Sequence, residues 1–174
     1  MADKLQLLWD RRCIEDRLAQ YCRAGDTRDP ALAKDCYWPE ATDDHGIYSG
    51  NAHAFIDAAM TQGFEQILAT QHFLGQVYVD VSGDRAEAES YLIACHRVSG
   101  HSDVVRAVLG ETYFAQHEND GGTHDWIAGG RWLDQFERRG EEWRIIARQA
   151  TTEWCTASPT ARIMAESLLS RQQA

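Results

Sequence analysis

The sequence predicts a single α+β domain, in which helices come first and an antiparallel sheet follows. Two changes of pattern indicate this order. Residues 3–24 carry apolar side chains at helical spacing, whereas from about residue 71 onward apolar and polar residues alternate. Turn sequences divide the second half, at Ser82-Gly83-Asp84 and at Arg139-Gly140. Alternating segments divided by short turns are the pattern expected for strands joined by hairpins.

The composition fits one soluble domain spanning residues 1–174. Of its 174 residues, 44% are hydrophobic, enough for a sizeable core. The formal charge of −10 opposes binding to nucleic acid or to an anionic membrane. The five cysteines contain no CxxC pair, which predicts neither a disulfide framework nor a zinc site. With no recognisable leader or membrane span, we expect a cytoplasmic protein.

The first helix is expected to end at Gly25, in the left-handed conformation that often closes a helix. Asp29 and Pro30 then predict the N-cap and first residue of a short second helix that reaches about Tyr37. This arrangement places Asp26 in a tight turn between the two helices. An aspartate in a turn commonly accepts hydrogen bonds from nearby backbone amides.

Residues 39–50 are expected to form a polar loop before a third helix, which Asn51 would cap and which would continue to about residue 64. Asp43, Asp44 and His45 lie together in that loop. Three such side chains so close in one loop lack the dispersed geometry of a closed metal shell. We therefore interpret them as solvated charges of a turn.

The predicted strand over residues 85–98 has one face of small and apolar side chains, which runs from Ala86 to Val98 and includes His96. That face is expected to point inward. A histidine buried in this way is either a hydrogen-bonded core residue or part of a pocket.

His72 opens the preceding strand, residues 71–81, but strict alternation puts it opposite the apolar face that begins with Val77. A bulge at Gly75 would turn His72 toward the core. Glycine inside a strand often marks such a bulge.

The remaining segments are less regular. Residues 102–123 fit either an amphipathic helix or a strand, with a turn at residues 119–122. Two further strands, 126–137 and 143–154, are joined by a hairpin. A C-terminal helix is expected from about Pro159.

Arg131 follows two adjacent glycines, Gly129 and Gly130, which indicate a bend or a close approach of two backbones. An arginine that points inward there would hold an anion. One that points outward would pair with Asp134 or Glu137. The pattern leaves both orientations open.

Three stretches together resemble the SnoaL-like branch of the nuclear transport factor two-like superfamily, in particular its scytalone dehydratase and hexachlorocyclohexane dehydrochlorinase members. They are YCRAGDTRDP (21–30), QHFLGQVYVDV (71–81) and GGRWLDQFERRGEEWRI (129–145), and the resemblance covers about residues 8–155. It implies a cone-shaped α+β barrel, in which a strongly curved mixed sheet and the N-terminal helices enclose a pocket. It also implies a homodimer or homotrimer.

The resemblance further implies that Asp26 and His72 form a catalytic dyad with His72 as the general base. Arg131 would stabilise negative charge, and Tyr21 would donate a hydrogen bond in the pocket. The dehydrochlorinase has a lysine where this chain has Tyr21, which favours dehydration over dehalogenation. His96 falls close to a second histidine of scytalone dehydratase. The other expected pocket residues are His45, Tyr48, Phe73 and Trp132, with Trp38 and Phe55 as further apolar walls.

These expectations favour a cofactor-independent lyase acting on a hydrophobic cyclic or aromatic compound. A carboxylate at one imidazole nitrogen fixes the tautomer and raises the basicity of the other, so His72 would remove an activated proton while water or another small group leaves. No cofactor or metal is expected, because the sequence lacks G-x-G-x-x-G and a spaced ligand set. The same residues are compatible with an isomerase, a cyclase or a formaldehyde-releasing carbon–carbon lyase. The fold is also compatible with a non-catalytic binding protein or an assembly protein like an oxygenase β subunit.

Overall fold

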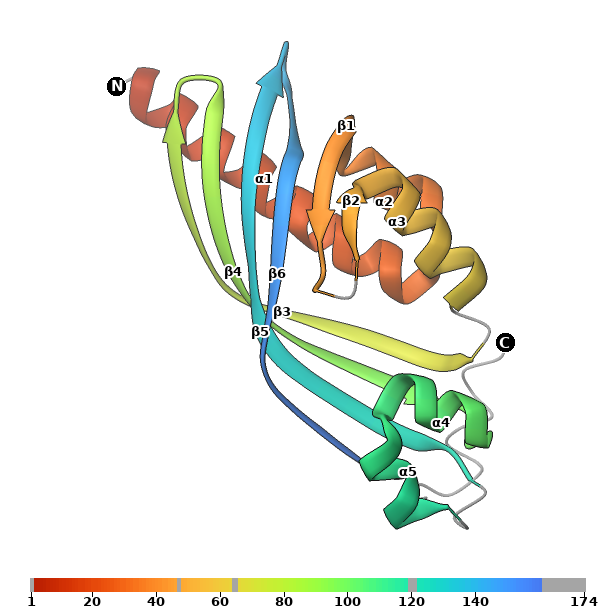
Figure 1. The fold of residues 1–174 in the computed structure, drawn as a ribbon. Coiled ribbons are helices and arrows are strands. Elements are labelled where there is room, and N and C mark those ends of the chain that lie inside the picture. The colour runs from red at the N-terminus through yellow and green to blue at the C-terminus, as the bar shows by residue number, and fades with distance from the viewer. Residues whose placement is uncertain (1, 47, 64–65, 119–121, 161–174) are drawn as a thin grey trace, which may run out of the picture.

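The computed structural model describes residues 2–46, 48–63, 66–118 and 122–160. One long helix lies beside a sheet of long, bent strands, and the shorter helices form two separate groups (Figure 1). The helices are α1 (Ala2–Thr27), α2 (Pro30–Asp35), α3 (Ala52–Asp57), which continues into the π-helical segment η1 (Ala58–Gly63), α4 (Ser102–Leu109) and α5 (Glu111–His117). The strands are β1 (Tyr37–Asp44), β2 (Ser49–Asn51), β3 (Ile67–Ser82), β4 (Arg85–Val98), β5 (His124–Arg139) and β6 (Glu142–Pro159).

The six strands form one mixed sheet in the order β2-β1-β6-β5-β4-β3. Only β1 and β6 run parallel among the paired strands of the described residues. The predicted α+β fold, with a strongly curved sheet and N-terminal helices, is confirmed. The sheet is not closed into a barrel, because β2 and β3 remain its two edges.

A bend crosses the long strands at one level of the sheet. The pairing of β3 with β4 shifts between Leu74 and Val77, and the pairing of β5 with β6 shifts at Gly130. Leu92 of β4 pairs with Leu74 on one side and Gly130 on the other, which aligns the two irregularities. Bulges bend and twist a strand, so together they curl the sheet (Figure 1). The predicted bulge at Gly75 is therefore confirmed.

The two glycines of β5 allow a close approach of β6 at this bend. A Cβ atom on Gly130 would lie 1.8 Å from the carbonyl oxygen of Thr151, and one on Gly129 would lie 2.2 Å from the Trp154 ring. No side chain fits at such distances. The close approach predicted from the glycine pair is thus present.

The core lies between α1 and the inner face of the sheet. Asp10 of α1 is buried and accepts hydrogen bonds from the Trp143 indole nitrogen at 2.9 Å and from Arg138 at 3.1 Å. This contact ties α1 to the β5–β6 hairpin. The largest fully buried side chains of the core include Ile14, Leu18, Tyr37, Ile56, Phe136, Trp143 and Ile145.

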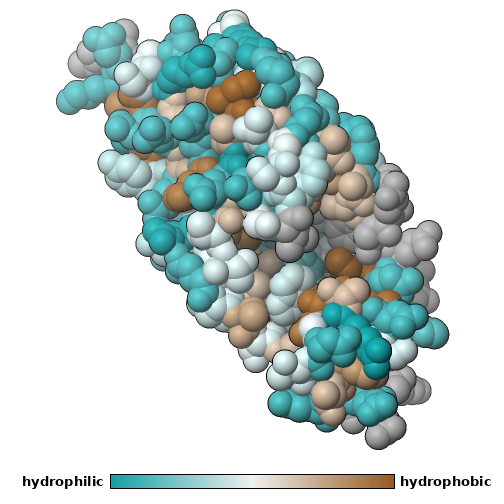
Figure 2. All heavy atoms as spheres, viewed as in Figure 1, coloured by the Kyte–Doolittle hydropathy of each residue, from teal (hydrophilic) through white to brown (hydrophobic). Residues whose placement is uncertain are grey.

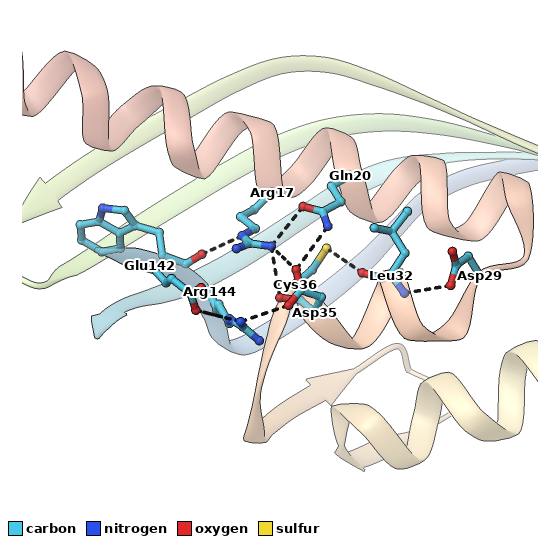
Figure 3. Close-up of polar contacts among 9 residues, drawn as sticks. Arg17, Gln20, Asp29, Leu32, Asp35, Cys36, Glu142 and Arg144 are labelled. Atoms are coloured by element: carbon cyan, nitrogen blue, oxygen red, sulfur yellow. Dashed lines mark hydrogen bonds and ion pairs between the residues drawn. The ribbon is translucent and has the colours of Figure 1, made fainter. Parts of the chain in front are cut away.

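A polar cluster joins α1 and α2 to β6 (Figure 3). Arg17 contacts the Asp35 carboxylate at 2.6 Å and donates to the backbone oxygen of Trp143 at 3.1 Å. Arg144 reaches the other carboxylate oxygen of Asp35 at 3.0 Å. Three elements that are distant in the sequence are therefore held together at one carboxylate.

The end of the first helix differs from the prediction. Gly25 stays helical, α1 continues to Thr27, and the left-handed residue is Arg28, with φ 57°. The Asp29 amide closes the helix by donating to the carbonyl of Ala24 at 2.9 Å. Asp26 consequently lies in the last turn of α1 and not in an inter-helix turn. The Asp29 cap and the Pro30 start of α2 are confirmed, since Asp29 accepts from the Leu32 amide at 2.9 Å.

The remaining segments agree with the prediction to different extents. The predicted loop over residues 39–50 is wrong, because it contains most of β1 and the start of β2. Asn51 does cap α3, accepting from the Ala54 amide at 3.1 Å. Residues 102–109 and 111–117 are helical and are separated by Gly110, while most of the expected turn at 119–122 lies outside the described residues. The expected C-terminal helix also lies outside them, and β6 continues to Pro159.

The surface seen in Figure 2 is mainly hydrophilic, with hydrophobic residues in small separate groups. No described helix has the length and apolar character needed to cross a membrane.

The close approach of β5 and β6 at Gly130 leads to a prediction about stability. Gly130→Ala should lower the free energy of unfolding by about 2 kcal/mol or more, because β5 and β6 must separate to admit the new methyl group. Gly75→Ala is the matched control, since its Cβ would lie 3.2 Å from the Tyr91 carbonyl oxygen and needs only a small shift. Urea denaturation would compare them. Equal stability of the two variants would contradict the close approach.

Candidate active site

A cavity of 170 Å³ lies between the N-terminal helices and the bent sheet. A hollow of 520 Å³ on another part of the sheet is larger, but no histidine lines it. The smaller cavity collects chemically useful side chains from both edges of the sheet and from its middle. Its lining residues are Tyr21, Cys22, Gly25, His45, Phe55, Ile56, Ala59, Met60, His72, His96 and Trp132.

Asp26 and His72 meet at this cavity, as predicted. The Asp26 carboxylate lies 2.8 Å from Nδ1 of His72, and the His72 backbone amide donates to both carboxylate oxygens at 3.1 Å. A carboxylate at Nδ1 holds the proton there and leaves Nε2 as the basic nitrogen. Gly25 gives the ring room, because a Cβ on it would lie 3.3 Å from Cε1 of His72.

His96 of β4 stands beside His72, with ring centroids 5.5 Å apart in an edge-to-face arrangement. Its Nδ1 lies 2.9 Å from the Thr70 hydroxyl. Burial, and secondly the proximity of His72, lower the pKa of His96 from its ordinary 6.5 to about 4. His96 is therefore a neutral ring at neutral pH.

Aromatic rings form another wall. The Tyr21 ring packs edge-to-face on Trp132, with centroids 5.4 Å apart. Burial raises the pKa of Tyr21 to about 12, although the charge of Arg148 opposes that effect, so its hydroxyl keeps its proton. Behind the rings, Arg148 lies 4.0 Å from the Trp132 centroid and makes two hydrogen bonds to Asp134, at 2.7 and 2.8 Å. A buried ion pair thus supports the aromatic wall.

His45 reaches the cavity from the turn between β1 and β2. Its ring stacks on Phe55 with centroids 4.4 Å apart, and its Nδ1 contacts the Asp43 carboxylate. Asp43 is only 1% exposed and accepts a hydrogen bond from the Tyr37 hydroxyl at 2.8 Å. The interpretation of this cluster as solvated turn charges is wrong for Asp43, because Ala41 and Asp43 alternate inward along a strand. That alternation was the sequence signal for Asp43. Asp44 does belong to the turn, where it accepts from the Gly46 amide at 2.9 Å.

The sequence of residues 6–149 matches the family model of the SnoaL-like domain. The chain belongs to the SnoaL-like family. Its fold is similar to that of a hexachlorocyclohexane dehydrochlorinase, LinA-type3, from Novosphingobium barchaimii, with 15% identity, 92% of this chain and 96% of that chain covered, and a TM-score of 0.69. For a putative scytalone dehydratase from Novosphingobium aromaticivorans the identity is 17%, the coverage 94% and 100%, and the TM-score 0.69. For a putative aromatic ring hydroxylase from the same organism the identity is 22%, the coverage is 88% of this chain and 94% of that chain, and the TM-score is 0.67. No curated protein matches the chain.

In this SnoaL-like chain, Arg131 lies away from the cavity. Its guanidinium contacts Glu89 at 2.8 Å and Glu153 at 2.5 Å, and these carboxylates raise its pKa. Trp132 faces the cavity, so alternation sends its neighbour Arg131 to the opposite face. Of the two orientations that the sequence left open, Arg131 takes the outward one, with Glu89 and Glu153 as its partners and not Asp134 or Glu137. It does not hold an anion in the cavity, as the resemblance implied. The cation close to the aromatic wall is Arg148, which the sequence analysis did not single out.

Three expected wall residues do not line the cavity either. Phe73 is 52% exposed on the outer face, because its neighbour His72 points inward. Trp38 packs between Arg139 and Arg144, away from the cavity. Tyr48 lies beside Phe55, with ring centroids 5.3 Å apart, and does not reach the lining.

Tyr21, His45, Phe55, His96 and Trp132 do line the cavity together with His72, as expected. The cavity is also lined by four residues that were not predicted from the sequence: Cys22, Ile56, Ala59 and Met60. The spacing of Ile56 and Met60 on one helical face was the signal that could have identified them. Among the described residues, no cluster of three or more His, Cys, Asp or Glu side chains has a metal-binding arrangement.

The lowered pKa of His96 predicts a pH-dependent stability. Below its ordinary pKa of 6.5 an unfolded chain takes up a proton at His96, while the folded chain does not until about pH 4. The stability that depends on the neutral ring is complete above pH 6.5 and is lost as the pH falls toward 4, by about 3 kcal/mol.

His96→Gln should remove that part of the pH dependence in urea denaturation between pH 7 and pH 4. Thr70→Val is the control, since it removes the hydrogen bond but keeps the imidazole, and should keep the wild-type slope. An unchanged slope in His96→Gln would contradict the assignment.

Proposed function

We propose that this SnoaL-like protein is a cofactor-independent cytoplasmic lyase that performs a dehydratase-type elimination on a hydrophobic cyclic or aromatic compound. The observation that supports it is the 2.8 Å contact between Asp26 and His72 at the wall of an internal cavity. This pair leaves Nε2 of His72 to act as a base without a metal. The structural similarity to proteins described as a dehydrochlorinase and a putative scytalone dehydratase agrees with an elimination.

In the proposed reaction, Nε2 of His72 takes a proton from a carbon next to a carbonyl group. The electrons of that C–H bond form a C=C bond, and the bond to a hydroxyl on the next carbon breaks, with its electrons going to oxygen. That oxygen takes a proton and leaves as water. Asp26 stabilises the imidazolium while it exists.

The other cavity residues would bind and orient the compound. Tyr21 keeps its proton and can donate to the carbonyl oxygen, where negative charge develops. Phe55 and Trp132 offer aromatic faces to a ring. The cavity of 170 Å³ is smaller than the usual ligand pocket of about 300–1,000 Å³, which favours a compact substrate.

We also propose that the protein forms a homodimer or homotrimer. The outer face of the sheet exposes large apolar side chains that a second copy would cover. They include Phe73, Tyr78, Tyr91 and Trp154.

Mutation of the dyad tests the function. His72→Ala and Asp26→Asn should each reduce turnover by about 10²- to 10⁴-fold, because one removes the base and the other loses control of its tautomer. Product mass spectrometry on hydroxylated, halogenated and methoxylated cyclic and aromatic compounds, without added cofactor, would measure it. His101→Ala and Asp84→Asn are matched surface controls. Full activity in either dyad variant, with an unchanged circular dichroism spectrum, would exclude the dyad.

Gly25→Ala should lower activity without lowering stability. Alanine favours a helix over glycine by about 1 kcal/mol, so the free energy of unfolding should rise or stay constant. Its methyl group would press on the His72 ring from 3.3 Å and shift the base by a few tenths of an ångström. We expect turnover to fall about 10-fold, since catalysis is sensitive to such displacements. Thermal denaturation and turnover, measured together, check this, and wild-type turnover would show that the ring has spare room.

A further inference from the structure

The cavity contains a second pairing of a carboxylate with an imidazole. Asp43 and His45 make the same kind of Nδ1 contact as Asp26 and His72, and both imidazoles line the cavity. The two pairs come from opposite edges of the sheet, one from β1 and the turn after it, the other from α1 and β3. We propose that Asp43–His45 is an acid pair, in which His45 gives a proton to the leaving group while His72 removes one from carbon. This proposal rests on the proposed lyase function.

The geometry of His45 fits a proton donor. Asp43 holds Nδ1, and stacking on Phe55 at 4.4 Å fixes the plane of the ring. Nε2 makes no hydrogen bond to any described residue, although the ring lies at the cavity and its side chain is 23% exposed. His45 therefore has one nitrogen bound to a buried carboxylate and the other available to a ligand.

The surroundings of the two carboxylates differ, and the difference assigns their roles. Asp43 is almost fully buried, and besides His45 it receives only the Tyr37 hydroxyl among the described residues. The nearby buried cation, Arg148, is already paired with Asp134 through two hydrogen bonds. An uncompensated buried charge is costly, so Asp43 favours a positively charged partner, and that partner is His45.

Asp26 has a different environment. Its side chain is 26% exposed, and two of its contacts are hydrogen bonds from the His72 backbone amide. Part of its charge is therefore satisfied before the imidazole ring is considered. Asp26 therefore needs a cationic partner less than Asp43 does, and Nε2 of His72 is assigned as the proton acceptor. The two pairs thus divide into a base, His72, and an acid, His45.

The proton balance of the elimination then closes within the cavity. Nε2 of His72 takes the proton from carbon, the C=C bond forms, and the C–O bond breaks with its electrons on oxygen. Nε2–H of His45 gives its proton to that oxygen, which leaves as water. His72 ends charged and His45 neutral, and a proton passed through water from His72 to His45 restores both for the next turnover.

Two probe reactions separate the acid from the base. Deuterium uptake at carbon 2 of 1-tetralone in D₂O needs removal of a proton from carbon and return of a deuteron to the same carbon, with no leaving group. Dehydration of 3-hydroxy-1-tetralone to 1-naphthol needs that step and protonation of the leaving oxygen. His45→Gln should keep the exchange rate within about 2-fold and lower dehydration about 100-fold or more, the usual contribution of a general acid. His72→Ala should lose both reactions, and His101→Gln is the matched control that should keep both.

A change of leaving group gives an independent check. Chloride leaves without a proton, so elimination from 3-chloro-1-tetralone, corrected for the spontaneous rate, should be nearly unaffected in His45→Gln. Asp43→Asn should follow His45→Gln in all three assays. A direct measurement needs no substrate: ¹⁵N NMR of the wild-type histidines, with His45 assigned by its absence in His45→Gln, should show both of its ring nitrogens protonated.

The outcomes distinguish the two proposals. Equal losses of exchange and dehydration in His45→Gln, or wild-type dehydration in that variant, would overturn the acid role and leave the lyase standing. A neutral His45 ring in the NMR spectrum would also overturn it. A wild-type protein that neither exchanges nor dehydrates these compounds would count against the proposed lyase itself, and the acid role would fall with it.

Discussion

The close approach of β5 and β6 at Gly130 is the constraint on which the cavity depends. A side chain there would meet the carbonyl oxygen of Thr151 at 1.8 Å, so only glycine lets the two strands bend together. The bulge at Gly75 bends β3 at the same level of the sheet. Because the bend crosses the sheet, both of its edges reach the N-terminal helices. A flat sheet would keep the two edge strands, and the histidines that come from them, far apart.

Buried charge accompanies this curvature. Arg148 and Asp134 pair inside the protein, and the guanidinium lies against the rings of Tyr21 and Trp132. Removing such charges from water costs free energy, so the pair is weak evidence for extra stability. The pair affects the position of the Tyr21 and Trp132 rings, because the planar guanidinium packs behind this aromatic wall of the cavity. Although Asp43 lies opposite Arg148 in the β1–β6 pairing, its carboxylate contacts His45, and the hydrogen bonds of Arg148 go to Asp134.

Local sequence signals were dependable where one residue decides the conformation. Asn51 and Asp29 cap helices because their short side chains reach the free amides of the first turn. Gly75 marked a bulge, and the bulge put His72 on the inner face. Local signals left the orientation of Arg131 open, because it depends on which face of β5 is buried, and the burial of the adjacent Trp132 decides that.

The sequence by itself determined that a long helix comes first and an antiparallel meander comes last, together with two helix caps and the inward face that carries His96, because each depends on neighbours within a few positions. It also carried the resemblance that linked Asp26 with His72. Only the tertiary structure decided that Gly25 continues a helix, that Asp43 is buried, and that His45 shares a cavity with His72. The last two of these features depend on the bend and on the parallel pairing of β1 with β6. Such contacts join residues about a hundred positions apart, beyond the reach of any local pattern.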